Sequence, residues 1–334
     1  MVYETKFMSN YKPPYQITDV MIDLLSQISE LVGKWSMTTQ GELSPELRKK
    51  NRIKTIQASL AIENNTLTVA QVAAIMNGER VLGLPHEILE VKNAIEAYAN
   101  LIHWKSTAVS HLLAAHQLLM QGLKKDAGKL RNSDVGIYKD IKLMHMAPPV
   151  KQIPVLLDDL VDWCKNTKAH PLIKSCIFHY EFEFIHPFSD GNGRMGRMWQ
   201  TLMLSEWNPL LAYLPIETLI KKRQKEYYEV LGKADSNADS TVFIEFMLHA
   251  IKEELSDGIN DGINDGIKLS DTDKIILKNI KSNPRITAQE LKEKIHKSLR
   301  TIERSLKKLK TQKYINRIGS NKTGYWKVMT VGKS

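Results

Sequence analysis

Residues 186–197 restrict the fold of this chain more than any other segment, because glycines interrupt it between two stretches with helical apolar spacing. After Arg194 the apolar residues recur at three and four positions, which predicts a helix that begins there. Gly191 and Gly193 can adopt a positive φ, and Asn192 between them is the non-glycine type that best tolerates it. We therefore expect a loop that ends at the N-terminus of a helix.

The residues of this loop suit phosphate chemistry. Its backbone N–H groups can form a nest for an anion, and the positive end of the following helix would face the same anion. Arg194 and Arg197 lie three apart on that helix, and each offers a planar fork suited to phosphate oxygens. Asp190 supplies an oxygen ligand for Mg²⁺, and His186 could take a proton from an incoming hydroxyl near neutral pH. This inventory predicts phosphoryl or nucleotidyl transfer.

Position by position, the segment resembles the signature His-x-Phe-x-Asp/Glu-Gly-Asn-Gly-Arg-x-x-Arg of the Fic family, and no signature position departs from it. The resemblance implies an all-helical core and transfer of AMP from ATP to a hydroxyl side chain of a target protein, which is called AMPylation. Some relatives transfer other phosphate-containing groups. The resemblance also implies that His186 is the base, Phe188 a buried anchor of the loop and Asp190 the Mg²⁺ ligand. The implied anion hole and outer-phosphate contacts are Gly191, Asn192, Gly193, Arg194 and Arg197.

A second constellation, from Ser59 to Asn64, lies upstream. The preceding run, residues 47–62, is rich in helix formers, and threonines follow it at positions 66 and 68. We therefore expect Glu63 in the last turn of a helix, with Asn64 as a left-handed cap. A carboxylate at this end opposes the helix dipole, so Glu63 favours a cationic partner.

The same segment matches the inhibitory motif Ser/Thr-x-x-x-Glu-Gly/Asn of Fic proteins, with Asn64 where glycine is commoner. It resembles the subgroup with an N-terminal inhibitory helix, in which the glutamate pairs with the second signature arginine, here Arg197. This implies that Glu63 blocks the productive position of the γ-phosphate and that the isolated protein is largely autoinhibited. Ser59, one turn earlier, faces the same way and is expected to orient Glu63. Some relatives with this glutamate also remove AMP, so a bifunctional enzyme stays open.

Three shorter matches extend the resemblance. Residues 128–131 resemble the Gly-x-x-Arg before the family's flap, and residues 140–149 resemble the flap hairpin, whose edge could hold an extended target segment. A simple surface loop is the alternative for this hairpin. Tyr227 and Tyr228 fall where relatives place an aromatic near adenine, although either could belong to the core. We interpret His179 as a packed structural histidine.

Length and charge distribution predict two folded parts. The 334 residues, 43% of them hydrophobic, suffice for two domains with separate cores. The net charge of +10 is concentrated after position 267, where 18 Lys and Arg face 5 Asp and Glu. Just before, an Asp-Gly-Ile-Asn unit repeats, and its six Asp and Gly among eleven residues disfavour a stable isolated helix. We expect a helical region at 1–110 with the inhibitory helix at about 45–64, the catalytic core at 111–255, a linker at 256–267 and a small domain at 268–331.

The order of elements after the repeat resembles a winged helix. Residues 273–281 read as a helix, Thr287 to Glu290 as a capping box that opens a second, and Ser298 as the cap of a third. Two strands follow, at 314–318 and 325–328. A protein-docking or dimerisation role is the alternative to DNA contact. The candidate DNA-binding residues are Arg300, Arg304, Lys307, Lys308, Arg317 and Lys322.

The predicted fold class is mainly α: a helical Fic core with a short β-hairpin flap, plus a small α+β winged-helix domain. Cys164 and Cys176 lie in apolar surroundings, which favours buried free thiols and a cytoplasmic location. We expect no signal peptide and no membrane span. ATP, Mg²⁺ and a target protein are the expected partners, and self-association stays open. A DNA-binding regulator whose core senses nucleotide is the alternative, but a sensor would not need His186.

Overall fold

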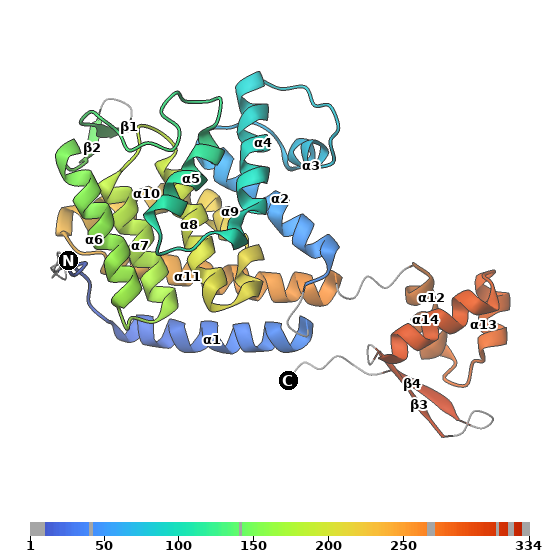
Figure 1. The fold of residues 1–334 in the computed structure, drawn as a ribbon. Coiled ribbons are helices and arrows are strands. Elements are labelled where there is room, and N and C mark those ends of the chain that lie inside the picture. Colours follow the sequence, from blue (N-terminus) through green and yellow to red (C-terminus); the bar gives the residue numbers. More distant parts are fainter. Residues whose placement is uncertain are drawn as a thin grey trace, which may run out of the picture. The chain divides into compact units, whose positions relative to one another are not determined.

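The structure of the chain is a computed structural model that describes residues 11–39, 43–139, 142–265, 271–311, 314–319 and 324–328. The chain divides into two compact units, Met1–Ile263 and Asn264–Ser334. Both units are mainly helical, and each contains one two-stranded antiparallel sheet (Figure 1). This arrangement confirms the fold class predicted from the sequence.

The first unit is built from helices that follow one another through short connections. Its α-helices are α1 (Asp19–Thr39), α2 (Pro45–Ile62), α3 (Val69–Met76), α4 (Pro85–Ala99), α5 (Val109–Met120), α6 (Ile153–Asn166), α7 (Pro171–Ile185), α8 (Asn192–Trp207), α9 (Ile216–Lys222), α10 (Gln224–Asn237) and α11 (Thr241–Asp265). The 3₁₀ turns are η1 (Leu101–His103), η2 (Val150–Gln152) and η3 (Pro209–Tyr213). Local chemistry sets several of these boundaries: Ser44 caps α2 by accepting the Leu47 N–H at 3.1 Å, and prolines stand in the first turns of α2, α4, α6 and α7.

Helices α7 and α8 form the centre of this unit and lie side by side (Figure 1). Helix α7 is buried on nearly its whole circumference, as expected for a helix surrounded by others. Phe178, Phe182 and Ile185 of α7 pack in one buried cluster with Met195 and Trp199 of α8. The short segment that carries the signature residues joins these two helices, so a rigid core supports both of its ends.

A β-hairpin follows α5 in the chain. Its strands β1 (Gly136–Lys139) and β2 (Lys142–Met146) pair in antiparallel register from Gly136 with Met146 to Lys139 with Lys142, with a bulge between Ile137 and Tyr138. The predicted flap at 140–149 therefore contains the second strand, while the first strand lies before it. Residues 140 and 141 lie outside the described part of the chain.

The Asp-Gly-Ile-Asn repeat is helical as far as Asp265, where the sequence disfavoured a helix. The repeat is not an isolated segment, because it continues α11 from turns that bury Phe243, Met247 and Leu255 completely. A helix already nucleated by packing extends at a lower cost than one that must start in the repeat itself. The two compact units divide inside this repeat, between Ile263 and Asn264.

The second unit contains three helices and a hairpin in the predicted order. These elements are α12 (Asp271–Ser282), α13 (Ala288–Ile295), α14 (Leu299–Thr311), β3 (Ile315–Ile318) and β4 (Tyr325–Val328). Both hydrogen bonds of the predicted capping box are present between Thr287 and Glu290, and Ser298 Oγ accepts the Thr301 N–H at 3.2 Å. Ile276, Leu291 and Ile302 bury their side chains in a separate core.

Two further expectations concern the cysteines and membrane-spanning helices. Cys164 and Cys176 are buried free thiols, as predicted, and desolvation raises the pKa of each to about 12. None of the helices in the described ranges combines the length and the apolar character that crossing a bilayer requires.

Candidate active site

The signature segment begins where α7 ends. His186 adopts a left-handed conformation, with φ 49° and ψ 60°, and stops the helix. Its backbone N–H donates to the Phe182 carbonyl at 3.0 Å, and its carbonyl accepts from Arg131 Nε at 2.8 Å. A left-handed conformation is costly for a residue with a Cβ, so contacts on both sides must hold it. The half-buried imidazole of His186 is thereby carried on a fixed backbone.

Asn192 closes the segment, and its conformation differs from the one expected. Gly191 has a positive φ of 82°, but Asn192 and Gly193 are helical, so α8 begins at Asn192 rather than at Arg194. The Asn192 side chain folds back onto the loop: Oδ1 accepts the Phe188 N–H at 3.0 Å, and Nδ2 donates to the Phe188 carbonyl at 2.8 Å. The sequence reasoning had assigned Asn192 to the anion hole and missed this second function as a clamp.

His116, on α5, packs against the signature segment. The sequence reasoning did not identify this residue either. Its ring stacks on the buried Phe188 ring, with 3.6 Å between centroids and 4° between planes. The Gly128 N–H donates to Nδ1 at 2.9 Å, so Nε2 carries the proton and donates to the Asp190 carbonyl at 3.0 Å. Burial lowers the pKa of His116, with Arg194 acting in the same direction. A neutral histidine thus ties the loop to the chain that leads into the hairpin.

Arg131, the arginine of the Gly-x-x-Arg match, makes the second such tie. Its side chain is 3% exposed and donates to three carbonyls: His186 at 2.8 Å, Ser133 at 2.7 Å and Pro148 at 2.5 Å. Ser133 precedes the hairpin and Pro148 follows it. One guanidinium therefore joins the signature segment to both ends of the hairpin.

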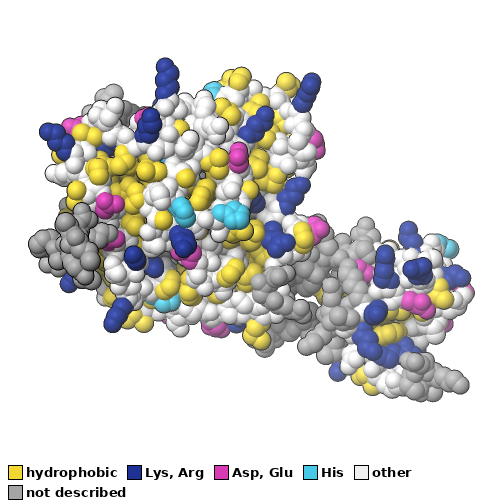
Figure 2. Space-filling model, in the orientation of Figure 1, with side chains coloured by type: hydrophobic (Ala, Val, Ile, Leu, Met, Phe, Trp, Pro, Cys, Tyr) yellow, Lys and Arg dark blue, Asp and Glu magenta, His cyan; other side chains and the backbone are white. Residues whose placement is uncertain are grey.

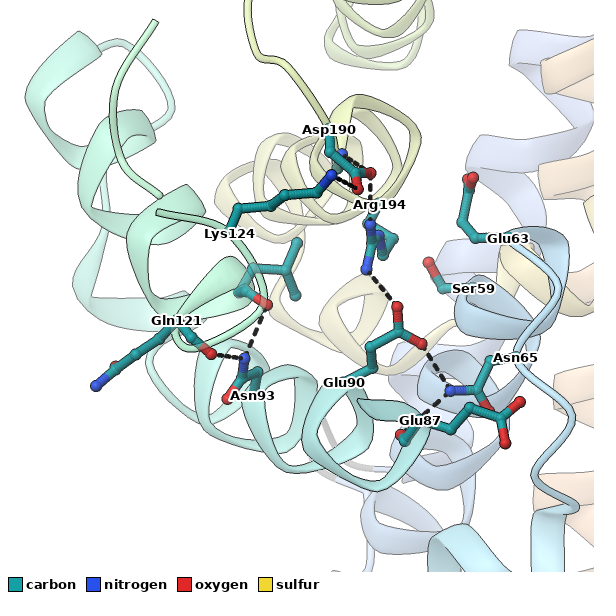
Figure 3. Close-up of polar contacts among 12 residues, drawn as sticks. Ser59, Glu63, Asn65, Glu87, Glu90, Asn93, Gln121, Lys124, Asp190 and Arg194 are labelled. Carbon is teal, nitrogen blue, oxygen red and sulfur yellow. Dashed lines mark hydrogen bonds and ion pairs between the residues drawn. The ribbon is translucent and has the colours of Figure 1, made fainter. Parts of the chain in front are cut away.

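Asp190 lies at the open side of the loop between two cations. Its Oδ1 accepts from Arg194 Nη2 at 2.9 Å and from the Gly191 N–H at 2.6 Å, while Oδ2 lies 3.2 Å from Lys124 Nζ. Figure 3 shows Lys124 and Arg194 pointing toward this carboxylate. Burial alone would raise the pKa of Asp190, but Arg194, Lys124 and the Gly191 N–H hold it below the ordinary value. The Asp190 carboxylate is therefore ionised, and its oxygens can act as metal ligands.

Arg197 and the end of α2 meet as the resemblance implied. Arg197 Nη2 donates to Glu63 Oε1 at 2.7 Å and to the Ser59 carbonyl at 3.1 Å, and its Nε donates to Ser59 Oγ at 3.1 Å. Asn64 has a φ of 69°, so it is the left-handed cap that the sequence predicted. A Cβ added at Gly193 would lie 2.5 Å from Glu63 Oε1, so this carboxylate sits directly against the first turn of α8.

The first signature arginine also has a glutamate partner, which the sequence reasoning missed. Arg194 Nη1 donates to Glu90 Oε1 at 3.0 Å, and Glu90 belongs to α4 (Figure 3). Each arginine of the segment is therefore paired with a carboxylate from the helices that precede the core. Polyphosphate would have to compete with these carboxylates for the guanidinium groups.

The tyrosines proposed to contact adenine lie differently from each other. Tyr227 is 1% exposed, and its hydroxyl bonds to His179 Nε2 at 3.0 Å, so it is a core residue. This burial favours the core alternative, and contact of Tyr227 with the nucleotide stays a prediction. Tyr228 is half-buried beside it. His179 is fully buried between Tyr227 and Gln200, as predicted, and burial lowers its pKa to about 3.

In the second unit, α14 presents basic residues to solvent. Arg300, Arg304 and Lys307 are exposed, while Ile302 and Leu309 on the opposite side are fully buried. Figure 2 shows Lys and Arg side chains gathered over this unit. The Arg317 guanidinium lies 4.8 Å from the centroid of the Trp326 ring in the hairpin. The side chain of Lys308 and all of Lys322 lie outside the described residues.

Comparisons with known proteins match two parts of the chain to known families. Residues 106–204 match the Fic/DOC family, and residues 269–316 match a winged helix-turn-helix DNA-binding family. The chain is 25% identical over 218 residues to Protein adenylyltransferase Fic of Drosophila willistoni, which covers 62% of this chain and 42% of the fly protein. It is 28% identical over 221 residues to a probable protein adenylyltransferase of Aquifex aeolicus, covering 58% of this chain and 68% of that protein. The chain thus spans less than half of the fly relative.

A solved structure matches over almost the full length. The crystal structure of a Fic family protein from Desulfovibrio desulfuricans G20 is 44% identical, with a TM-score of 0.73, and the match covers 97% of this chain and 100% of that chain. Such coverage extends over both compact units of the chain. The chain belongs to the Fic/DOC family.

Proposed function

We propose that this protein is an adenylyltransferase that moves AMP from ATP to a Tyr, Thr or Ser hydroxyl of a target protein. The observation that carries the proposal is the placement of half-buried His186 and Asp190 on one short loop that leads directly into the first turn of α8, with Arg194 and Arg197 on that helix. The names of the fly and Aquifex relatives support a reaction of this class.

The chemistry follows from what these groups can do. The target hydroxyl attacks the α-phosphorus of ATP and gives its proton to His186. A bond forms between the hydroxyl oxygen and phosphorus, the bond to the bridging oxygen of the β-phosphate breaks, and pyrophosphate leaves. The N–H groups at the start of α8 have no intrahelical partner and can face the phosphate oxygens. Arg194 and Arg197 would hold the outer phosphates.

Asp190 fits the expected Mg²⁺, because Mg²⁺ commonly takes one or two protein carboxylates together with phosphate oxygens and water. Its carboxylate is ionised, and its side chain is 38% exposed at the mouth of the loop. Substrate phosphates and water would complete the coordination of the metal. Mg²⁺ bound there would neutralise charge that develops on the phosphate oxygens.

Glu63 supports a second part of the proposal, namely that the isolated enzyme is restrained. The carboxylate occupies the space in front of Gly193, beside the Arg197 guanidinium. A phosphate group cannot share that space, and like charges would repel it. ATP therefore has to displace Glu63 before Arg197 can hold the γ-phosphate.

The test uses ATP labelled at the α-phosphate, with Mg²⁺ and a cell lysate as a source of targets. We expect weak protein labelling by the wild type, at least tenfold stronger labelling by Glu63→Gly, and none by Glu63→Gly/His186→Ala. Glu46→Gly, at the exposed first turn of the same helix, is the matched control and should behave as the wild type. Labelling that persists without His186 would overturn the mechanism.

We propose DNA binding as a second function, located in the winged-helix unit. Its support is the exposed basic face of α14 together with the family match of residues 269–316. Fluorescence anisotropy with a labelled DNA duplex should give binding that weakens steeply with salt, because phosphate contacts release counterions. The Arg300→Glu/Arg304→Glu variant should bind at least tenfold more weakly than Lys278→Glu/Lys281→Glu, whose charge change on α12 is equal. Equal loss in the two variants would overturn the assignment to α14.

A further inference from the structure

Arg194 is held between two carboxylates that face it from different parts of the chain. Its Nη1 donates to Glu90 Oε1 at 3.0 Å, and its Nη2 donates to Asp190 Oδ1 at 2.9 Å (Figure 3). The guanidinium side chain is 6% exposed and that of Glu90 is 17% exposed, whereas Asp190 is 38% exposed. Glu90 is thus the more buried of the two partners, and it stands in the middle of α4, outside the signature and the inhibitory motif.

Glu90 itself is fixed from its other side. Its Oε2 accepts from Asn65 Nδ2 at 2.8 Å, and the same Nδ2 also donates to the Glu87 carbonyl at 3.2 Å. Asn65 Oδ1 accepts the Leu67 N–H at 3.0 Å, so the amide cannot turn over without losing bonds. Both oxygens of Glu90 therefore face donors, and its orientation is determined by the turn that also carries Glu63.

In this arrangement Arg194 gives one Nη group to Glu90 and the other to Asp190. Arginine prefers to bind a carboxylate through two parallel N–H···O bonds, and Asp190 is the carboxylate that Arg194 would still contact if Glu90 were removed. Lys124 already occupies Oδ2 of Asp190 at 3.2 Å. An Arg194 that closed onto Asp190 with both nitrogens would compete with any metal for the same oxygens.

We propose that Glu90 is a positioning residue that holds Arg194 away from full pairing with Asp190. Asp190 then remains available as an oxygen ligand, and the remaining N–H groups of Arg194 remain available to phosphate. The inference rests on the proposed adenylyltransferase function. It states that Glu90 sets the orientation of Arg194, the first arginine of the signature. Asn65 supports Glu90, so the turn after α2 sets the partner of each signature arginine.

The substitution Glu90→Gln tests this geometry with little change in volume. A glutamine cannot accept from both Arg194 and Asn65 as the carboxylate does. With its NH₂ group toward Arg194 the bond to Arg194 is lost, and with its NH₂ group toward Asn65 that bond is lost and only a neutral oxygen accepts from Arg194, so the hold on Arg194 is weakened or lost. The variant is made in the Glu63→Gly background, where Arg197 no longer pairs with Glu63. Glu96→Gln is the matched control, because Glu96 lies exposed on the same helix. Asn65→Ala should act in the same direction as Glu90→Gln, with a smaller effect.

We expect kcat for AMP transfer to fall about tenfold in Glu90→Gln, while the Kd for ATP without Mg²⁺ changes less than threefold. Removing a carboxylate does not weaken anion binding by itself, because it reduces repulsion of the phosphates. Calorimetry should also show that Mg²⁺ strengthens ATP binding at least threefold less in Glu90→Gln than in the Glu63→Gly parent. Glu96→Gln should match the parent in all three measurements.

An unchanged or higher kcat in Glu90→Gln would overturn the proposal, as would an equal loss of ATP binding with and without Mg²⁺. The second result would mean that Glu90 only supports the folding of the site, and a lower melting temperature would accompany it. If the Glu63→Gly parent transfers no AMP, the proposed function fails instead. The calorimetric comparison still decides the role of Glu90 in that case, because it needs no transfer.

Discussion

The Glu63 carboxylate and the Arg197 guanidinium form a 2.7 Å ion pair across 134 positions of sequence. Arg197 is 2% exposed, and burial alone would lower its pKa, but Glu63 and neighbouring groups raise the pKa above the ordinary value. A buried guanidinium that stays charged requires a counter-ion. Glu63 supplies it in the structure, and in the proposed reaction a phosphate group would replace it.

Ser59→Ala should release this restraint in part. The substitution removes the Oγ that accepts from Arg197 Nε at 3.1 Å, but it keeps the Ser59 carbonyl and Glu63. A hydrogen bond to a charged group is worth roughly 1.5–3 kcal/mol, so AMP transfer at low ATP should rise by about tenfold and stay below that of Glu63→Gly. Initial rates with labelled ATP measure this. Ser26→Ala, an exposed helix position, should have no effect, and a fall in rate for Ser59→Ala would contradict the prediction.

Gly193→Ala should expel Glu63 without activating the enzyme. The new Cβ would lie 2.5 Å from Glu63 Oε1 and 3.0 Å from Arg197 Nη1, so the carboxylate must move. The methyl group would then stand where a phosphate has to approach the first turn of α8. In the Glu63→Gly background we expect Gly193→Ala to reduce transfer more than tenfold. Gly33→Ala is the control, since a Cβ there meets nothing within 4 Å. Activity equal to Glu63→Gly would show that phosphate does not use this space.

Local patterns of the sequence sufficed for the elements that local interactions fix. Ser59, Glu63 and Asn64 were predicted at the end of a helix from the break in helix formers, and Asn64 has the expected left-handed φ of 69°. The capping box of Thr287 and Glu290 was predicted from residue types three apart, and both of its bonds are present. Interactions within one helical turn are readable because the spacing alone brings the partners together.

Contacts that depend on tertiary packing could not be read in the same way. His116 bonds to a carbonyl 74 positions away and Glu90 to an arginine 104 positions away, and neither has a local pattern that marks it. The start of α8 was placed two residues late, because apolar spacing does not reveal the bonds between the Asn192 side chain and Phe188. The repeat before Asp265 is helical since it extends buried turns of α11, which its own composition does not predict.

Tyr227→Phe separates a core role from contact with nucleotide. His179 Nδ1 faces the Gln200 amide oxygen at 2.7 Å, so Nε2 accepts from the Tyr227 hydroxyl at 3.0 Å. Removing that hydroxyl leaves a buried acceptor without its donor, which costs roughly 1–3 kcal/mol of unfolding free energy. We expect that loss in urea denaturation, together with a Kd for ATP within twofold of the wild type. ATP binding weakened tenfold at unchanged stability would instead return Tyr227 to the nucleotide site.

The last prediction concerns the dependence of stability on pH through His116. Its folded-state pKa lies below the ordinary value of 6.5 because burial disfavours the charged ring. Nδ1 also accepts a hydrogen bond from the Gly128 N–H at 2.9 Å. A protonated ring cannot make this bond, because both of its nitrogens carry a proton. For a histidine with a lowered pKa, the stabilisation is fully present above pH 6.5 and is lost as the pH falls through the folded-state value.

We therefore expect the wild type to exceed His116→Gln in unfolding free energy by more at pH 7.5 than at pH 5. Denaturation at both pH values measures this, and taking the difference between variants cancels most of the titration of other groups. His103→Gln, at an exposed position, should track the wild type at both values. If the difference in unfolding free energy between the two proteins instead grew toward pH 5, the charged ring would be the stabilising form. The assignment of a neutral His116 that bonds to both Gly128 and Asp190 would then be wrong.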